Sequence, residues 1–160
     1  MRGPIQGVDP LLAPLLFTFI QTREELELHT SGLTAEQVWM RPHGLAPLGF
    51  HLRHIAGSVD RLAAYLRGRP LSDPQREALE KEMEPGAGPA ELLAAIDGIF
   101  RQVEGVVRGL DAARLTEWRG VGRKQLPATA IGLLVHIAEH TQRHLGQAIV
   151  MAKLVRALSR

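Results

Sequence analysis

The stretch LGFHLRHIAGSVDRLAAYLR at residues 48–67 decides the fold of this chain. Its large apolar residues follow alternating steps of four and three, and they are Leu48, Leu52, Ile55, Val59, Leu62 and Leu66. That repeat is typical of a helix that packs one face along the seam of a bundle. Gly68 and Pro70 come directly afterwards and would stop the helix. The spacing therefore predicts a long, half-buried helix over residues 48–67.

Three further long helices are predicted over residues 10–29, 89–110 and 127–158. Asp9 can cap the first of them, and Pro10 fits its first turn because the missing N–H of proline has no partner there anyway. Four long helices without a strand pattern indicate an all-α four-helix bundle. The length of 160 residues suits a single domain, which we expect to span residues 1–160.

The connections between these helices carry signals of their own. Thr34 and Gln37 match a capping box, which predicts a short helix after the first long one. A second short helix is predicted over residues 74–83. Residues 111–125 are polar, and we expect them to be irregular, with Trp118 as their anchor on the bundle.

Composition excludes several classes of site and partner. The chain has no cysteine, so a disulfide, a thiolate zinc site and a cysteine nucleophile are all excluded. The net charge of +2 comes from dispersed basic residues, which argues against nucleic-acid binding. No segment approaches the roughly 18 uninterrupted apolar residues of a membrane-spanning helix. The N-terminus also lacks the apolar core of a signal peptide. We therefore expect a cytoplasmic protein with no membrane or nucleic-acid partner.

The histidines give the strongest indication of chemistry. His140 and His144, in HIAEHTQRHLGQ at residues 136–147, are four residues apart and so lie on one helix face. A rotation of about 100° per residue places both on an apolar face, where an unpaired polar group costs free energy. A metal ion would satisfy them, because zinc and nickel accept neutral imidazole and a catalytic site typically has three protein ligands. The pair predicts a metal site that needs a third ligand from another helix.

The third ligand is expected from residues 49–62, where spacing alone leaves His51 and His54 both open. His51 lies nearer the apolar seam of that helix. His54 shares a different stripe, which resembles the wall of a cleft and contains Phe50, Ser58, Arg61 and Tyr65. In such a cleft Arg61 could hold a substrate carboxylate and Tyr65 could donate a hydrogen bond. A surface salt bridge is an equally good interpretation for Arg61.

His136 begins an H-x-x-E-H pattern that also occurs in inverted zinc proteases. Those enzymes need an acidic ligand further along the chain, and no Asp or Glu follows His140. The protease interpretation is therefore poor. Glu139 and His136 are expected at the surface or in support of the site, and Gln147 either near the site or exposed.

Three segments in the same order resemble the DinB-like (DinB/YfiT-type) superfamily of metal-dependent enzymes. They are LTAEQVWMRP at residues 33–42, GFHLRHIAGSVDRL at 49–62 and HIAEHTQRHLGQ at 136–147. The resemblance implies a four-helix bundle, often a homodimer, with zinc or nickel on three histidines that match His54, His140 and His144. It selects His54 over His51, which spacing does not. Leu145 departs from the pattern, because many members carry arginine after the last ligand.

Related enzymes include thiol S-transferases that use bacillithiol or mycothiol. The resemblance therefore implies a metal-dependent enzyme that transfers a low-molecular-weight thiol, or a related hydrolase. A divalent ion with an open position can favour the thiolate of a bound thiol, so the protein needs no cysteine of its own. The alternative is a non-catalytic, dimeric helical bundle that binds a metal or a ligand.

Overall fold

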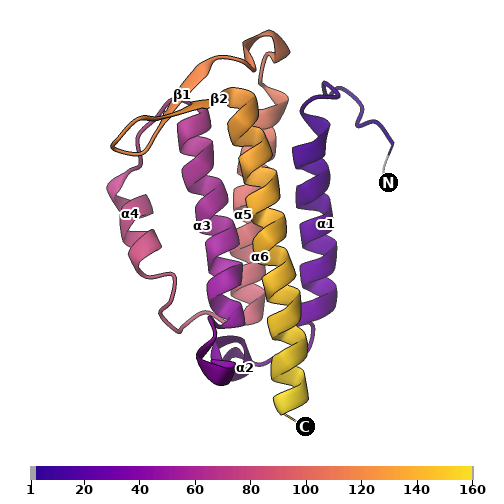
Figure 1. The fold of residues 1–160 in the computed structure, drawn as a ribbon. Helices are drawn as coiled ribbons and strands as arrows, with labels where there is room; N and C mark the ends of the chain where they lie inside the picture. Colours follow the sequence, from indigo (N-terminus) through magenta and orange to yellow (C-terminus); the bar gives the residue numbers. More distant parts are fainter. Residues whose placement is uncertain (1–2, 160) are drawn as a thin grey trace.

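The computed structural model describes residues 3–159, so residues 1, 2 and 160 of the expected domain lie outside it. Its four long helices lie side by side, and they are α1 (Ala13–Thr30), α3 (Leu48–Leu66), α5 (Pro89–Arg108) and α6 (Ala130–Leu158) (Figure 1). This arrangement confirms the all-α four-helix bundle. The shorter elements are α2 (Ala35–Trp39), α4 (Asp73–Glu80), the 3-10 turns Pro42–Gly44 and Ala112–Arg114, and strands β1 (Trp118–Val121) and β2 (Leu126–Thr129).

The long helices do not simply alternate in direction. α3 and α5 run the same way, and α1 and α6 run the opposite way (Figure 1). Consecutive parallel helices need a return connection, and α4 supplies it along the outer side of α3. The segment after α4 therefore passes close to the middle of α3, where it can contact residues of the proposed site.

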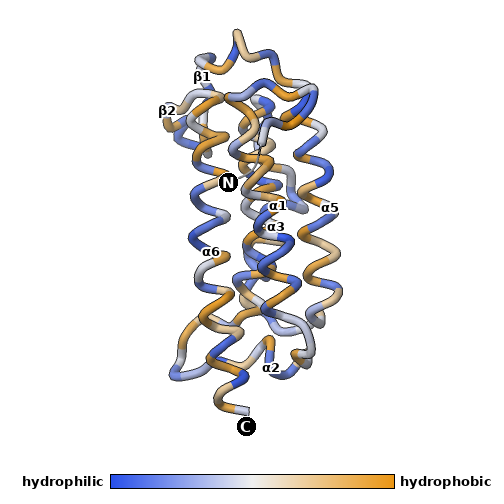
Figure 2. The backbone as a smooth tube through the Cα atoms, turned by 90° about the vertical axis from the view of Figure 1, so that its right-hand side faces the viewer, coloured by the Kyte–Doolittle hydropathy of each residue, from blue (hydrophilic) through white to orange (hydrophobic). Residues whose placement is uncertain are grey.

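The core follows the apolar seams of the four long helices. Leu48, Leu52, Ile55 and Val59 of α3 are all fully buried, as the repeat predicts. Phe19 of α1 stacks on Phe100 of α5 with ring centroids 4.0 Å apart. Figure 2 shows apolar and polar residues alternating along the helices, which is how one chain covers a core and keeps a polar surface.

The first helix begins later than expected. It starts at Ala13 instead of Pro10, because residues 9–12 form a turn in which the Leu12 N–H donates to the Asp9 carbonyl. Asp9 still caps this turn, since its carboxylate accepts from the Leu11 N–H at 2.8 Å. The capping box of Thr34 and Gln37 is present as predicted at the start of α2.

Two expectations for this region are wrong, namely the irregular, Trp118-anchored connection over residues 111–125 and the start of the last helix at residue 127. β1 and β2 pair antiparallel as a hairpin, with Trp118 opposite Thr129, so α6 starts only at Ala130. Trp118 is not an anchor, because 58% of its surface is exposed, and Leu115 is the buried residue of this connection. Within residues 3–159, no helix has both the length and the apolar character needed to cross a membrane.

Candidate metal centre

Four of the seven histidines gather where α3 faces α6. α3 supplies His51 and His54, and α6 supplies His140 and His144. His54 Nε2 lies 2.9 Å from His140 Nε2, and the ring of His54 is 4.2 Å from that of His144. One ring nitrogen of each of His54, His140 and His144 lies within 4.8 Å of the other two. The geometry thus brings together the three histidines that the resemblance selects.

A carboxylate fixes the orientation of His54. His54 Nδ1 lies 2.6 Å from Oε2 of Glu82, a residue just after α4 that is only 4% exposed. Because a carboxylate can only accept, Nδ1 carries the proton and donates it to Glu82. This leaves Nε2, which faces His140 and His144, as the nitrogen that could bind a metal. A histidine that binds a metal usually donates its other N–H in this way, so the donor set fits a divalent ion.

The carboxylate is itself held by an arginine. Arg61, 8% exposed on α3, donates from Nη1 to Oε1 of Glu82 at 2.8 Å. Burial disfavours the charged form of Glu82, but the hydrogen bonds from His54 and Arg61 and the charge of Arg61 outweigh it. The pKa of Glu82 is therefore lowered. Arg61 serves the site by holding Glu82, and it neither contacts a substrate cleft nor forms a surface salt bridge.

Comparisons with known proteins show the family and support the fold. The family model of the DinB superfamily matches residues 18–148. The chain belongs to the DinB superfamily. The fold is also similar to a solved structure of a conserved protein from Enterococcus faecalis, with a TM-score of 0.73 and 16% identity over 89% of this chain and 95% of that one. No curated protein matches the sequence.

A fourth histidine lies beside the group of three in this DinB-superfamily protein. His51 is 7% exposed, and its Nδ1 lies 3.2 Å from Nδ1 of His144. Spacing alone left His51 and His54 open, and the structure places both within reach of α6. Of these two histidines, only His54 has a ring nitrogen within 4.8 Å of ring nitrogens of both His140 and His144. Only His54 contacts Glu82.

Other residues named from the sequence lie outside this group. His136 is exposed and pairs with Glu139 at 2.7 Å, which forms a second, surface group with His140. Gln147 is exposed. Leu145, where many DinB-like proteins carry arginine, is 2% exposed and belongs to the core. The middle of the stripe that runs from His54 to Tyr65 is buried at Ser58 and Arg61, so it is no open cleft wall.

Glu82 is the residue that sequence reasoning missed. It lies in EALEKEME at residues 77–84, among several acidic residues with the same local spacing. A weak signal for this contact is present on α3, where Gly57 lies between His54 and Arg61 in the sequence. A Cβ at Gly57 would lie 2.6 Å from Glu82 Oε1 and 2.7 Å from Arg61 Nη1, so only glycine leaves room for the ion pair.

We expect Gly57→Ala to destabilise the protein, because its methyl group would force apart two buried, paired charges. Breaking such a pair outright costs about 3–5 kcal/mol, which is the upper limit here because the ends of both side chains can shift. The matched control is Gly98→Ala on α5, where a Cβ meets nothing within 4 Å. That change should stabilise the helix by about 0.5–1 kcal/mol. Urea unfolding of both variants measures the difference, and equal free energies of unfolding would contradict it.

Burial lowers the pKa of three of the four clustered histidines, His51, His140 and His144. Burial, followed by the nearby charge of His54, lowers the pKa of His51 to about 4. Burial and the neighbouring histidines lower the pKa of His144 to about 4 and lower that of His140 as well. Neutral rings offer lone pairs, so the cluster is ready to bind a cation near neutral pH.

The same shifts predict how the stability of the metal-free protein depends on pH. Unfolded histidines take up protons near pH 6.5, whereas His51 and His144 do so near pH 4 in the folded protein. The unfolded state then binds more protons between these values, so the free energy of unfolding should fall as the pH drops from 6.5 to 4. Unfolding in urea with a chelator present tests this, and a constant free energy over that range would refute it.

Proposed function

We propose that this DinB-superfamily protein is a metal-dependent enzyme whose divalent ion is bound by His54, His140 and His144. The observation that carries the proposal is the convergence of three imidazoles from two helices, one of them oriented by the buried carboxylate of Glu82. Imidazole donors without thiolate or further carboxylate suit zinc or nickel. Three protein ligands leave a position for a substrate, as in catalytic sites.

The proposed activity is transfer of a low-molecular-weight thiol, with hydrolysis as the related possibility. A bound divalent ion would favour the thiolate of an incoming thiol, or activate a water molecule. The residues of the chain orient and shield this chemistry. Glu82 keeps the His54 proton on Nδ1, and Arg61 keeps Glu82 in place. Phe50 stacks on His54 with ring centroids 5.3 Å apart, so it excludes water from one side of that ring.

The activity is tested with untagged protein, because a polyhistidine tag would itself bind metal. Metal-free protein is reconstituted with zinc, nickel or manganese and is supplied with bacillithiol, mycothiol, glutathione or cysteine and an aryl halide. We expect one metal and thiol pair to accelerate thiol consumption above the rate of free metal. The matched control is protein with His140 replaced by alanine. Reconstituted protein that binds metal but neither consumes a thiol nor hydrolyses an ester would refute the enzyme proposal.

A second candidate function, that of a non-catalytic metal-binding bundle, is favoured by His51. Its Nδ1 is close enough to His144 for a fourth imidazole to approach the ion. Four protein ligands would close the site, as in structural zinc centres. X-ray absorption spectroscopy of the zinc-loaded protein separates the two functions. Three imidazoles and a water molecule support the enzyme, whereas four imidazoles support the closed site.

We also propose a homodimer, on the strength of the family resemblance. Val135 and Val150 on α6 and Leu28 on α1 are 58%, 59% and 68% exposed, so these two helices offer apolar side chains to a second copy. Sedimentation velocity measures the mass directly. A monomer at micromolar concentration would refute this part of the proposal without affecting the metal site.

A further inference from the structure

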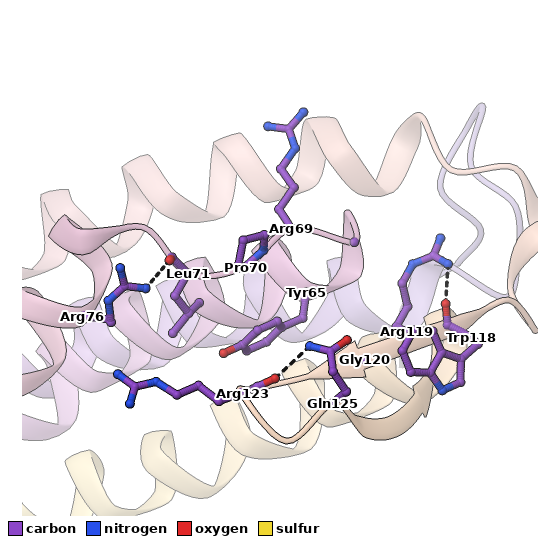
Figure 3. Close-up of a pocket in the computed structure, with 12 residues that line it drawn as sticks. Tyr65, Arg69, Pro70, Leu71, Arg76, Trp118, Arg119, Gly120, Arg123 and Gln125 are labelled. Atoms are coloured by element: carbon purple, nitrogen blue, oxygen red, sulfur yellow. Dashed lines mark hydrogen bonds between the residues drawn. The ribbon is translucent and has the colours of Figure 1, made fainter.

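A cavity lies where the end of α3 meets the β1–β2 hairpin, away from the four clustered histidines. It has a volume of about 600 Å³, which is within the range of small-molecule sites. The end of α3, the turn that follows it and the β1–β2 hairpin enclose it (Figure 3). Tyr65 marks its position on α3, eleven residues after His54, which is about 16 Å along a helix. The buried ion pair of Arg61 and Glu82 lies between the two places, so they are separate sites.

The cavity is positively charged. Its lining includes four arginines, which are Arg69, Arg76, Arg119 and Arg123, and no acidic residue. Arg76 is neutralised by Asp73, and Arg119 pairs with Glu117 at 3.1 Å. Arg123, at the tip of the hairpin, has no ion pair or hydrogen bond with any residue from 3 to 159. A guanidinium without a partner, beside others that are only locally neutralised, favours an anionic ligand.

Aromatic side chains form the walls of the same cavity. Trp118 and Tyr65 line it together with Pro70 and Leu71. The other tryptophan, Trp39, donates its indole N–H to the Ala87 carbonyl, whereas Trp118 has no such partner within residues 3–159. A Cβ at Gly120 would lie 2.6 Å from the Trp118 ring, so glycine lets that ring lie flat across the hairpin. Exposed rings placed in this way suit a flat apolar ligand.

The arginines lie next to one of the two aromatic rings, that of Tyr65, and Trp118 lies at the opposite end of the cavity (Figure 3). In Figure 3 the guanidinium groups of Arg76 and Arg123 and the hydroxyl of Tyr65 extend to the same side of the cavity, and Arg69 points away from them. We infer that this cavity is a binding site for a small aromatic anion, in which Arg123 and Arg76 hold a carboxylate or phosphate and Tyr65 contacts the ring. The site is independent of the histidines, so it stands or falls separately from the proposed metal chemistry.

Calorimetric titration of the untagged protein, as purified, with phenyl phosphate and with benzoate tests this site. The two probes distinguish a phosphate ligand from a carboxylate ligand. Benzamide supplies the ring without the charge, and inorganic phosphate supplies the charge without the ring. We expect at least one aromatic anion to bind at a single site, and both partial probes to bind at least tenfold more weakly. No binding of either aromatic anion at millimolar concentration would overturn the inference.

Variants locate the binding. Arg123→Gln and Tyr65→Leu change the two side chains that would contact the anion, and each should weaken binding at least tenfold. The melting temperature should stay unchanged for Arg123→Gln, because Arg123 is exposed. Arg69→Gln removes the same charge from a guanidinium that points away, and it should weaken binding less than threefold. Equal losses for Arg69→Gln and Arg123→Gln would show that the anion responds to the overall positive charge and not to contact with Arg123, which would overturn the inference. Loss of binding in His140→Ala would place the anion on the histidines and would also overturn it.

Discussion

Replacing His140 by alanine is expected to reduce the metal content of purified, untagged protein from about one ion per chain to nearly none, because two histidines hold a divalent ion far more weakly than three. His140 Nδ1 is buried and has no hydrogen-bond partner within residues 3–159, so removing the ring takes little from the metal-free fold. Elemental mass spectrometry measures the content. Thermal melts provide a second readout, since a ligand at one hundred times its dissociation constant stabilises a protein by about 2.7 kcal/mol.

Two further histidine variants make the result specific. His54→Ala should lose the metal as His140→Ala does, whereas His51→Ala should keep it, because only His54 is oriented by Glu82. His29→Ala is the control for nonspecific loss, since His29 contacts Glu25 at 3.4 Å, away from the cluster. Metal retained in both His54→Ala and His140→Ala would show that the ion is bound elsewhere.

Replacing Glu82 is expected to have the next largest effect, although Glu82 is not expected to touch the metal. Glu82→Gln should weaken metal affinity roughly 10- to 100-fold, the range found when the acceptor behind a metal-binding histidine is removed. The amide has lost the charge that holds the His54 proton on Nδ1. Glu82→Ala should in addition lower the free energy of unfolding by about 3–5 kcal/mol, because it leaves Arg61 buried without a partner. Competition with a zinc chelator measures the affinity, and urea unfolding measures the stability.

Glu84→Gln is the matched control for this experiment. It removes the same charge two residues away from an exposed side chain. The Glu84 carbonyl, which accepts from Arg53 at 2.6 Å, is unchanged by the substitution. Equal affinities for Glu84→Gln and Glu82→Gln would show that Glu82 acts only through net charge.

The sequence predicts the bundle because its apolar repeat is local. Leu48, Leu52 and Ile55 follow helical spacing, and a helix buries such residues whatever its partners are. The pair His140 and His144 was predictable for the same reason, since four residues on one helix are always neighbours. Spacing leaves the choice between His54 and His51 open, because that choice depends on which ring contacts Glu82. That contact joins residues 28 positions apart, and no periodicity records it.

The hairpin was missed because its strands carry little strand character of their own. WRGV and LPAT include glycine and proline, which are uncommon inside strands. Pro127 is tolerated because it pairs with Gly120 in a sheet of only two strands. Trp118 was expected to anchor this connection on the bundle, yet it is exposed and lines a cavity. That position depends on how α3 and the hairpin meet, which is a property of the assembled fold.

The return connection has a consequence for how quickly a bound ion could leave. None of the residues of α4 is buried, and polar contacts fix this segment to α3, among them Gln75 to Asp60 at 2.7 Å and Arg53 to the Lys81 carbonyl at 2.7 Å. Segments with few apolar contacts open locally at much lower free energy than the whole fold. Residues 73–80 are therefore expected to open more easily than the bundle, and the buried ion pair of Arg61 and Glu82 holds the segment that follows them. An opening that extends to Glu82 would withdraw its carboxylate from His54, so local opening of this connection, and not global unfolding, would limit how long a bound ion stays.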